Sequence, residues 1–113
     1  MNIQRMMKEA QAMQARLQQE MQKAQERLAE EQVEGHAGGG LVSVTLNGHK
    51  QLVGVKIKPE AVDPQDIETL EDLVFAAFTS ALGAADARAQ EVMAEVQGGL
   101  GLPPGIDLGG LLS

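Results

Sequence analysis

The sequence predicts an α+β protein in which two long helices flank a small antiparallel sheet. Residues 1–31 contain no Gly or Pro and consist mainly of good helix formers such as Met, Ala, Gln, Glu, Lys and Arg. Residues 33–58 change to alternating apolar and polar side chains around Gly-rich turns, which is typical of strands. Residues 63–97 return to helical spacing, so the expected order is helix, strands, helix.

Length and composition limit the possible classes of protein. The 113 residues suffice for one domain, residues 1–97, followed by a Gly/Pro-rich tail, residues 98–113. A domain of this size buries only about 60 to 70% of its unfolded surface, so a second subunit would help to complete its core. Without Cys, neither a disulfide framework nor a thiolate metal site can form. The charged amino terminus and the lack of an apolar run of about 18 residues predict a cytoplasmic protein.

The first helix carries a narrow apolar seam. At about 100° per residue, its members advance in steps of three and four, which is coiled-coil-like spacing. A helix of about 45 Å overhangs strands of about 25 Å, so the sheet cannot cover the whole seam. A second copy of the chain is the simplest candidate to cover the rest. The seam consists of Ile3, Met6, Ala10, Met13, Leu17, Met21, Ala24 and Leu28.

A stripe of positive charge follows another face of the same helix, about 130° from the seam. Residues 1–28 carry five basic and three acidic side chains, whereas residues 29–113 carry four basic and thirteen acidic ones. The two balances are +2 and −9, and together they give the formal net charge of −7. The stripe is about 33 Å long, close to the roughly 34 Å turn of duplex DNA. It consists of Arg5, Lys8, Arg16, Lys23 and Arg27.

This basic stripe has two interpretations. Phosphate binding fits its charge and its length, because Lys and Arg side chains neutralise phosphates and release counterions. A solvated helix face also fits, because Glu20 can reach Lys23 and further glutamates lie near Arg27. The residue pattern alone leaves both interpretations open.

The middle of the chain predicts a β-hairpin with a third strand before it. Two alternating runs are separated by the turn dipeptide Asn47-Gly48, so we expect them to pair. The third strand is expected near residues 33–36. The apolar positions of the hairpin are Val42, Val44, Leu46, Val53, Val55 and Ile57.

The second long helix is expected to begin with Asp63 as its N-cap and Pro64 at its first position. It should extend to about Gln97, because Gly98-Gly99 is a helix-stopping pair.

Catalysis finds little support in the sequence. His36 and His49 lie in expected turns without a nearby Cys or a spaced acidic cluster, so we expect both to be solvated. The Gly-rich segment at residues 38–40 precedes a strand, and so lacks the helix N-terminus of a phosphate-binding loop. The sequence therefore predicts no enzyme, no cofactor, no metal site and no small-molecule substrate.

Four segments in order resemble the YbaB/EbfC family of bacterial nucleoid-associated proteins: "MMKEAQAMQ", "GLVSVTLNG", "LEDLVFAAF" and "LPPG". The resemblance implies an α-β-β-β-α protomer and a homodimer with projecting helices, often likened to tweezers. It also implies binding to double-stranded DNA in the cytoplasmic nucleoid. Many members have a basic pair in the second helix where this chain has Gly83-Ala84, so the first helix carries the expectation of DNA binding.

Together these observations predict a homodimer that binds double-stranded DNA through the basic stripe and affects DNA conformation, nucleoid organisation and gene expression. Duplex should be preferred over single strands, because Trp and Tyr are absent and Phe75 and Phe78 are expected in the core. One alternative is a non-enzymatic chaperone or scaffold that grips a protein partner with its Met-rich seams. A role at a membrane surface is disfavoured, because the first helix lacks interfacial Trp and Phe.

Overall fold

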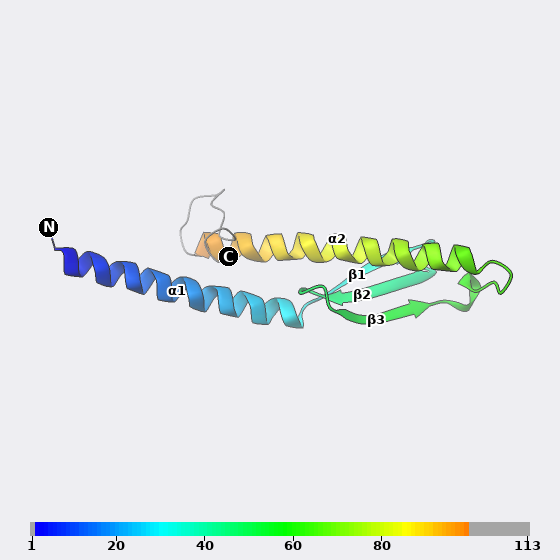
Figure 1. The fold of residues 1–113 in the computed structure, drawn as a ribbon, viewed down its shortest axis with the longest axis horizontal. Coiled ribbons are helices and arrows are strands. Elements are labelled where there is room, and N and C mark those ends of the chain that lie inside the picture. Colours follow the sequence, from blue (N-terminus) through cyan, green and yellow to red (C-terminus); the bar gives the residue numbers. More distant parts are fainter. Residues whose placement is uncertain (1, 100–113) are drawn as a thin grey trace.

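The computed structural model describes residues 2–99 and has the predicted order of elements (Figure 1). The two long helices and the antiparallel sheet are confirmed, including the third strand. The molecule is a rod of 78 × 22 × 20 Å with a radius of gyration of 20.5 Å, against roughly 13 Å for a compact domain of this length. The elements are α1 (Ile3–Glu30), β1 (Gln32–Ala37), β2 (Val42–Asn47), β3 (Leu52–Ile57), the short 3-10 helix η1 (Pro59–Ala61) and α2 (Ile67–Gly99).

Helix α2 covers β1 and β2 and leaves β3 largely uncovered. The strand order is β1-β2-β3, and both pairings are antiparallel. The core between helix and sheet is made of small side chains on α2 facing branched side chains on β2, which allows the helix to lie close to the sheet. Its fully buried members are Val42, Val44, Leu46, Ala77, Ala81 and Ala85.

The close approach of α2 to β1 depends on Gly35. A Cβ atom at this position would lie 2.2 Å from the backbone nitrogen of Ala81 and 2.3 Å from the carbonyl oxygen of Ala77. Both neighbours are backbone atoms and cannot rotate away. Only glycine therefore fits between strand and helix here.

The predicted hairpin forms, but with a bulge and a longer turn than expected. Leu46 pairs with Leu52, while Thr45 pairs with Gly54, so Val53 is an extra residue in β3. The alternation of apolar residues along the strand would place Val53 opposite Leu46. Because of the bulge, Leu52 lies there instead. The turn extends beyond Asn47-Gly48 and includes Lys50 in the left-handed region at φ 66°.

The same turn anchors the C-terminal end of α1. The Gly48 amide donates to the carbonyl oxygens of Leu28 at 2.8 Å and of Glu31 at 3.1 Å. The imidazole Nε2 of His49 donates to the carbonyl oxygen of Gln25 at 2.8 Å. His49 is exposed, as expected, and its ring also holds the turn against the C-terminal part of the helix.

Both predicted ends of α2 needed correction. The N-cap is Asp66 rather than Asp63, and the helix begins at Ile67, because Asp66 accepts hydrogen bonds from the amide and the hydroxyl of Thr69 at 3.2 and 2.6 Å. These bonds also lower the pKa of Asp66. Asp63 instead closes the preceding turn by accepting from the Gln65 amide. At the other end the helix continues through both expected stop glycines to Gly99; the rest of the predicted tail, residues 100–113, lies outside the described residues.

The substitution Gly35→Ala should lower the free energy of unfolding by about 3 kcal/mol or more, because strand and helix must separate to admit the methyl group. Gly54→Ala is the matched control on the same sheet, since a Cβ atom there meets nothing within 4 Å. Its effect should stay below about 1 kcal/mol. Chemical denaturation measures the free energy of unfolding of both variants. Equal values for Gly35→Ala and Gly54→Ala would contradict the close packing of α2 on β1.

Candidate nucleic-acid interface

Helix α1 leaves the body of the molecule as a projecting arm (Figure 1). Its C-terminal half packs on the end of α2, where Ala24 and Leu28 are buried against Val92 and Val96. Helix α2 ends beside Arg16, whose Nη2 donates to the carbonyl oxygen of Gly99 at 3.3 Å. Residues 3–15 therefore extend about 20 Å past the end of α2. The predicted overhang is confirmed, and the covered part of the seam lies against α2.

Three residues of the predicted basic stripe belong to this arm or to its base. Arg5 is widely exposed and pairs with Glu9 at 3.5 Å within the helix. Lys8 is exposed and has no ion pair within residues 2–99. Arg16 is also exposed and contacts only the neutral carbonyl of Gly99 among the described residues. The positive charge of the arm is thus little compensated.

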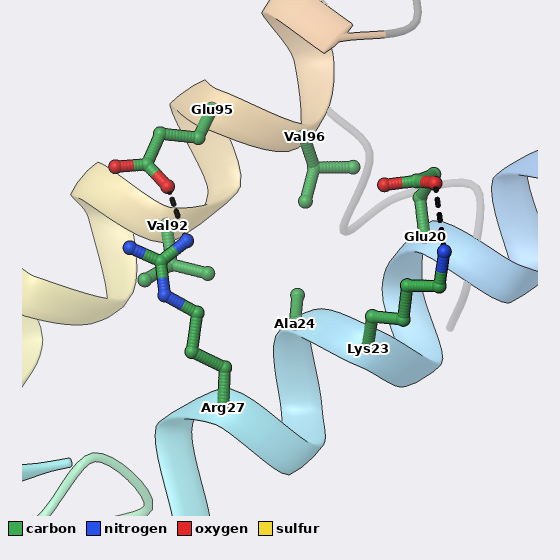
Figure 2. A pocket seen from close by; sticks show the side chains of 7 residues that line it. All are labelled: Glu20, Lys23, Ala24, Arg27, Val92, Glu95 and Val96. Atoms are coloured by element: carbon green, nitrogen blue, oxygen red, sulfur yellow. Dashed lines mark hydrogen bonds and ion pairs between the residues drawn. The ribbon is translucent and has the colours of Figure 1, made fainter.

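The other two stripe residues line a cleft between α1 and α2 (Figure 2). This cleft has a volume of about 340 Å³. Lys23 pairs with Glu20 at 3.7 Å, as the sequence indicated. Arg27 reaches across the cleft to Glu95 and also contacts Glu31 at 3.2 Å, so two carboxylates compensate one guanidinium.

The electrostatics of the cleft follow from these pairs. The hydrogen bond from Arg27 to Glu95, and the charge of that carboxylate, raise the pKa of Arg27. The pair is about half exposed on both sides, and exposed ion pairs contribute only about 0 to 1 kcal/mol. A phosphate group could therefore replace Glu95 at little cost.

A second ionic contact, between Glu31 and Arg88, clamps the foot of α1 to α2, and sequence reasoning missed it. Arg88 donates from Nη2 and Nε to the two carboxylate oxygens of Glu31, at 2.7 and 2.5 Å, and from Nη1 to Glu91 at 2.8 Å. The hydrogen bonds from Arg88 lower the pKa of Glu31 to about 2, and they raise the pKa of Arg88 in turn. Glu31 and Arg88 are 57 positions apart, so no local spacing rule could pair them.

An open apolar groove between α2 and β3 contradicts the expectation that both Phe side chains lie in the core. Phe75 is 74% exposed and Phe78 is 37% exposed. The reason is that α2 turns its alanine face to β1 and β2, which leaves the phenylalanines beside the uncovered strand β3. The groove has a volume of about 570 Å³, and its apolar lining includes Leu52, Val55, Ile57, Leu70, Val74, Phe75 and Phe78.

Residues 2–99 contain no group of three His, Cys, Asp or Glu side chains placed to hold a metal ion. His36 contacts the Ser43 hydroxyl at 2.9 Å and lies 3.4 Å from Glu34, in an exposed position. Within the same residues, no helix is both long and apolar enough to cross a membrane.

Comparisons with known proteins agree with this fold. The model of the YbaB/EbfC DNA-binding family matches residues 1–100. Nucleoid-associated proteins of Bacillus thuringiensis (strain Al Hakam) and Bacillus cereus (strain AH187) are each 54% identical to this chain over 87 residues, which is 77% of this chain and 80% of theirs. The crystal structure of an uncharacterized protein from Helicobacter pylori matches with a TM-score of 0.64 at 20% identity, over 84% of this chain and 96% of that chain. This last likeness concerns the fold alone.

The substitution Glu31→Gln should destabilise the protein at neutral pH, because it removes the ionised partner of Arg88. The lowered pKa of Glu31 means that the ionised carboxylate stabilises the folded state above its ordinary pKa of 4.5, and that this contribution fades as pH falls toward about 2. The difference in melting temperature between wild type and variant should thus be constant above about pH 5 and shrink below it. Glu30→Gln, which removes the neighbouring charge from the same helix end, is the control. A difference independent of pH would contradict the clamp.

Proposed function

This chain belongs to the YbaB/EbfC DNA-binding family, and from that premise we propose that it binds double-stranded DNA as a homodimer through the basic stripe of α1. The observation that carries the proposal is the projecting arm, because it holds positive charge away from an acidic body. As a nucleoid-associated protein it would change the conformation of the bound DNA, and through it nucleoid organisation and gene expression.

Charge is distributed as such a function requires. Residues 3–16 carry three basic side chains and one acidic side chain, whereas residues 29–99 carry four basic and twelve acidic ones. A duplex is therefore attracted to one end of the rod and repelled from the other. Because the arm extends past α2, phosphates can approach it without meeting the acidic surface.

The five stripe residues differ in how readily they could contact phosphates. Lys8 and Arg16 have no acidic partner among the described residues, and Arg5 has only a helical neighbour, Glu9. Before they can contact a phosphate, Lys23 must release the carboxylate of Glu20 and Arg27 that of Glu95. We therefore assign the first contacts to the arm and later contacts to the cleft. Phosphate contacts of this kind carry little sequence information, so sequence preference should be modest.

The homodimer would form through the apolar groove between α2 and β3. A two-fold axis brings the same surface from both copies together, so each Phe75 could enter the groove of the other copy. Exposed apolar surface of this kind commonly marks a protein interface. The groove lies at the sheet end of the rod, whereas α1 projects past the other end of α2 (Figure 1). Both arms would thus stay free for DNA.

Preference for duplex over single strands also depends on this interface. Single-strand binding proteins stack bases on exposed aromatic side chains. The two Phe residues are the whole aromatic content of the chain, and they lie in the groove rather than on the arm. Dimerisation would cover them and leave no stacking surface beside the basic stripe.

The double substitution Arg5→Gln/Lys8→Gln should weaken duplex binding and reduce its salt dependence. The slope of log K against log salt should become less steep by about 0.9 for each phosphate that the variant no longer neutralises. Fluorescence anisotropy with a labelled duplex, across a salt series, measures both quantities. Lys56→Gln/Lys58→Gln removes the same charge from the exposed end of β3 and is the matched control.

The control variant should bind nearly as well as wild type, because the removed charges lie at the sheet end of the rod. Equal losses in the two variants would mean that only net charge matters. Unchanged binding by the arm variant would make the stripe a solvated helix face. Tighter binding to single strands than to duplex would contradict the proposed preference.

The substitution Phe75→Ser should convert the dimer to a monomer, as measured by analytical ultracentrifugation, because it removes the most exposed large apolar side chain of the groove. Met13→Ser, which removes an exposed apolar side chain from the seam of α1, should leave the dimer intact. The opposite pattern would place the contact between copies on the seam. The monomer should also bind duplex more weakly, because it presents one arm instead of two.

A further inference from the structure

The apolar seam of α1 continues past the point where α2 stops covering it. Leu17 and Met21 are partly buried against the end of α2. Beyond them Ile3 is 67% exposed, Met6 56% and Met13 47%. We call these three residues and Ala10 the distal stripe. They have the same helical spacing as the covered part, so the arm presents a surface shaped for a partner like the one that covers the rest of the seam.

Helix α2 ends at one end of this stripe. The contact between Arg16 and the carbonyl oxygen of Gly99 fixes the last described residue of α2 beside residue 16 of α1. The two helices run in opposite directions, so the axis of α2 at Gly99 points toward the N-terminus of α1 (Figure 1). A chain that kept this direction would meet Met13 first, and Met6 and Ile3 after it.

We propose that residues 100–113 dock on the distal stripe and continue the cover that α2 begins. From residue 16 to residue 3 the arm measures about 20 Å, which about seven residues span in extended form at about 3.1 Å each. Fourteen residues follow Gly99, so the length is sufficient. Pro103 and Pro104 oppose a further helix and favour an extended chain. The apolar side chains available for docking are Leu100, Leu102, Ile106, Leu108, Leu111 and Leu112.

Position along the chain favours this segment over a second arm as the occupant. Residues 100–113 follow directly from Gly99, which lies beside residue 16 at the start of the distal stripe, so their docking is intramolecular and needs no association of two chains. They contain Asp107 and no Lys or Arg, so they add no positive charge to the arm.

The test compares the reactivity of methionine side chains with dilute peroxide, measured residue by residue with mass spectrometry. The leucine variant, Leu100→Ser/Leu102→Ser/Leu108→Ser, removes half of the apolar side chains of the segment, including the two that reach the distal stripe first. The control Gly105→Ser/Gly109→Ser/Gly110→Ser adds the same number of serines and keeps every apolar side chain. Met93, partly buried between α1 and α2, reports whether the fold is intact.

In wild type, docking should leave the distal stripe open no more than about a third of the time. Met6 and Met13 should therefore oxidise at least about threefold faster in the leucine variant than in wild type. The glycine control should match wild type, and Met93 should not change. The protection should also be independent of protein concentration, because it is intramolecular. Equal oxidation in all three proteins, or protection that grows with concentration, would overturn the proposal.

A second measurement needs no apolar substitution. The chain has no Cys, so Gly105→Cys can carry a single spin label on the part of the segment that would lie along the distal stripe. A docked segment would broaden the methyl signals of Met6 or Met13 in nuclear magnetic resonance spectra and leave that of Met93 sharp. If Met93 oxidation rises in the leucine variant, this experiment decides the question, and unbroadened signals at both arm methionines would rule docking out.

Discussion

The rest of the structure depends on the close packing of α2 on β1 and β2. Gly35 and the alanines facing it let the helix axis lie near the sheet, and the aliphatic side chains of β2 fill the remaining space. This choice of helix face decides where the larger side chains go. With alanines turned to the sheet, Phe75 and Phe78 lie beside β3, which α2 does not cover. One packing preference thus creates both the core of the protomer and the exposed groove.

The length of α2 sets the second feature, the projecting arm. Helix α2 is longer than the sheet it covers, so its C-terminal half is free to pack against α1. The foot of α1 is fixed by the Gly48 amide and by the paired Glu31 and Arg88, which hold the two helices side by side. Beyond Arg16 these supports end. The arm is therefore held at its base, and α2 does not cover it further out. Its outer part remains accessible to a separate molecule.

Sequence patterns predicted what is local and missed what depends on packing. The long Gly-free helix, the alternating strands and the basic face of α1 each follow from spacing within one element. Asp63 and Asp66 are both good caps, and only the folded contacts decide between them. Hydrophobicity marks Phe75 for burial, but does not say whether its own chain or another buries it. The sequence also gives no reason to rank the five basic residues of the stripe. Arg27 differs from the others because it pairs with Glu95, and this contact forms only when the two helices pack together.

In the structure the basic stripe has two parts: its cations on the arm are little compensated, whereas its cations in the cleft are paired with carboxylates. This division gives the acidic body of the molecule a role in the proposed function. A uniformly basic protein would bind a duplex in many orientations, whereas the acidic residues of the sheet and α2 oppose every approach except the one at the arms. The paired cations of the cleft would join only after the arms have engaged, when a phosphate lies near enough to compete with Glu95. Negative net charge is thus compatible with DNA binding, because the charge is separated along a rod instead of being spread over a sphere.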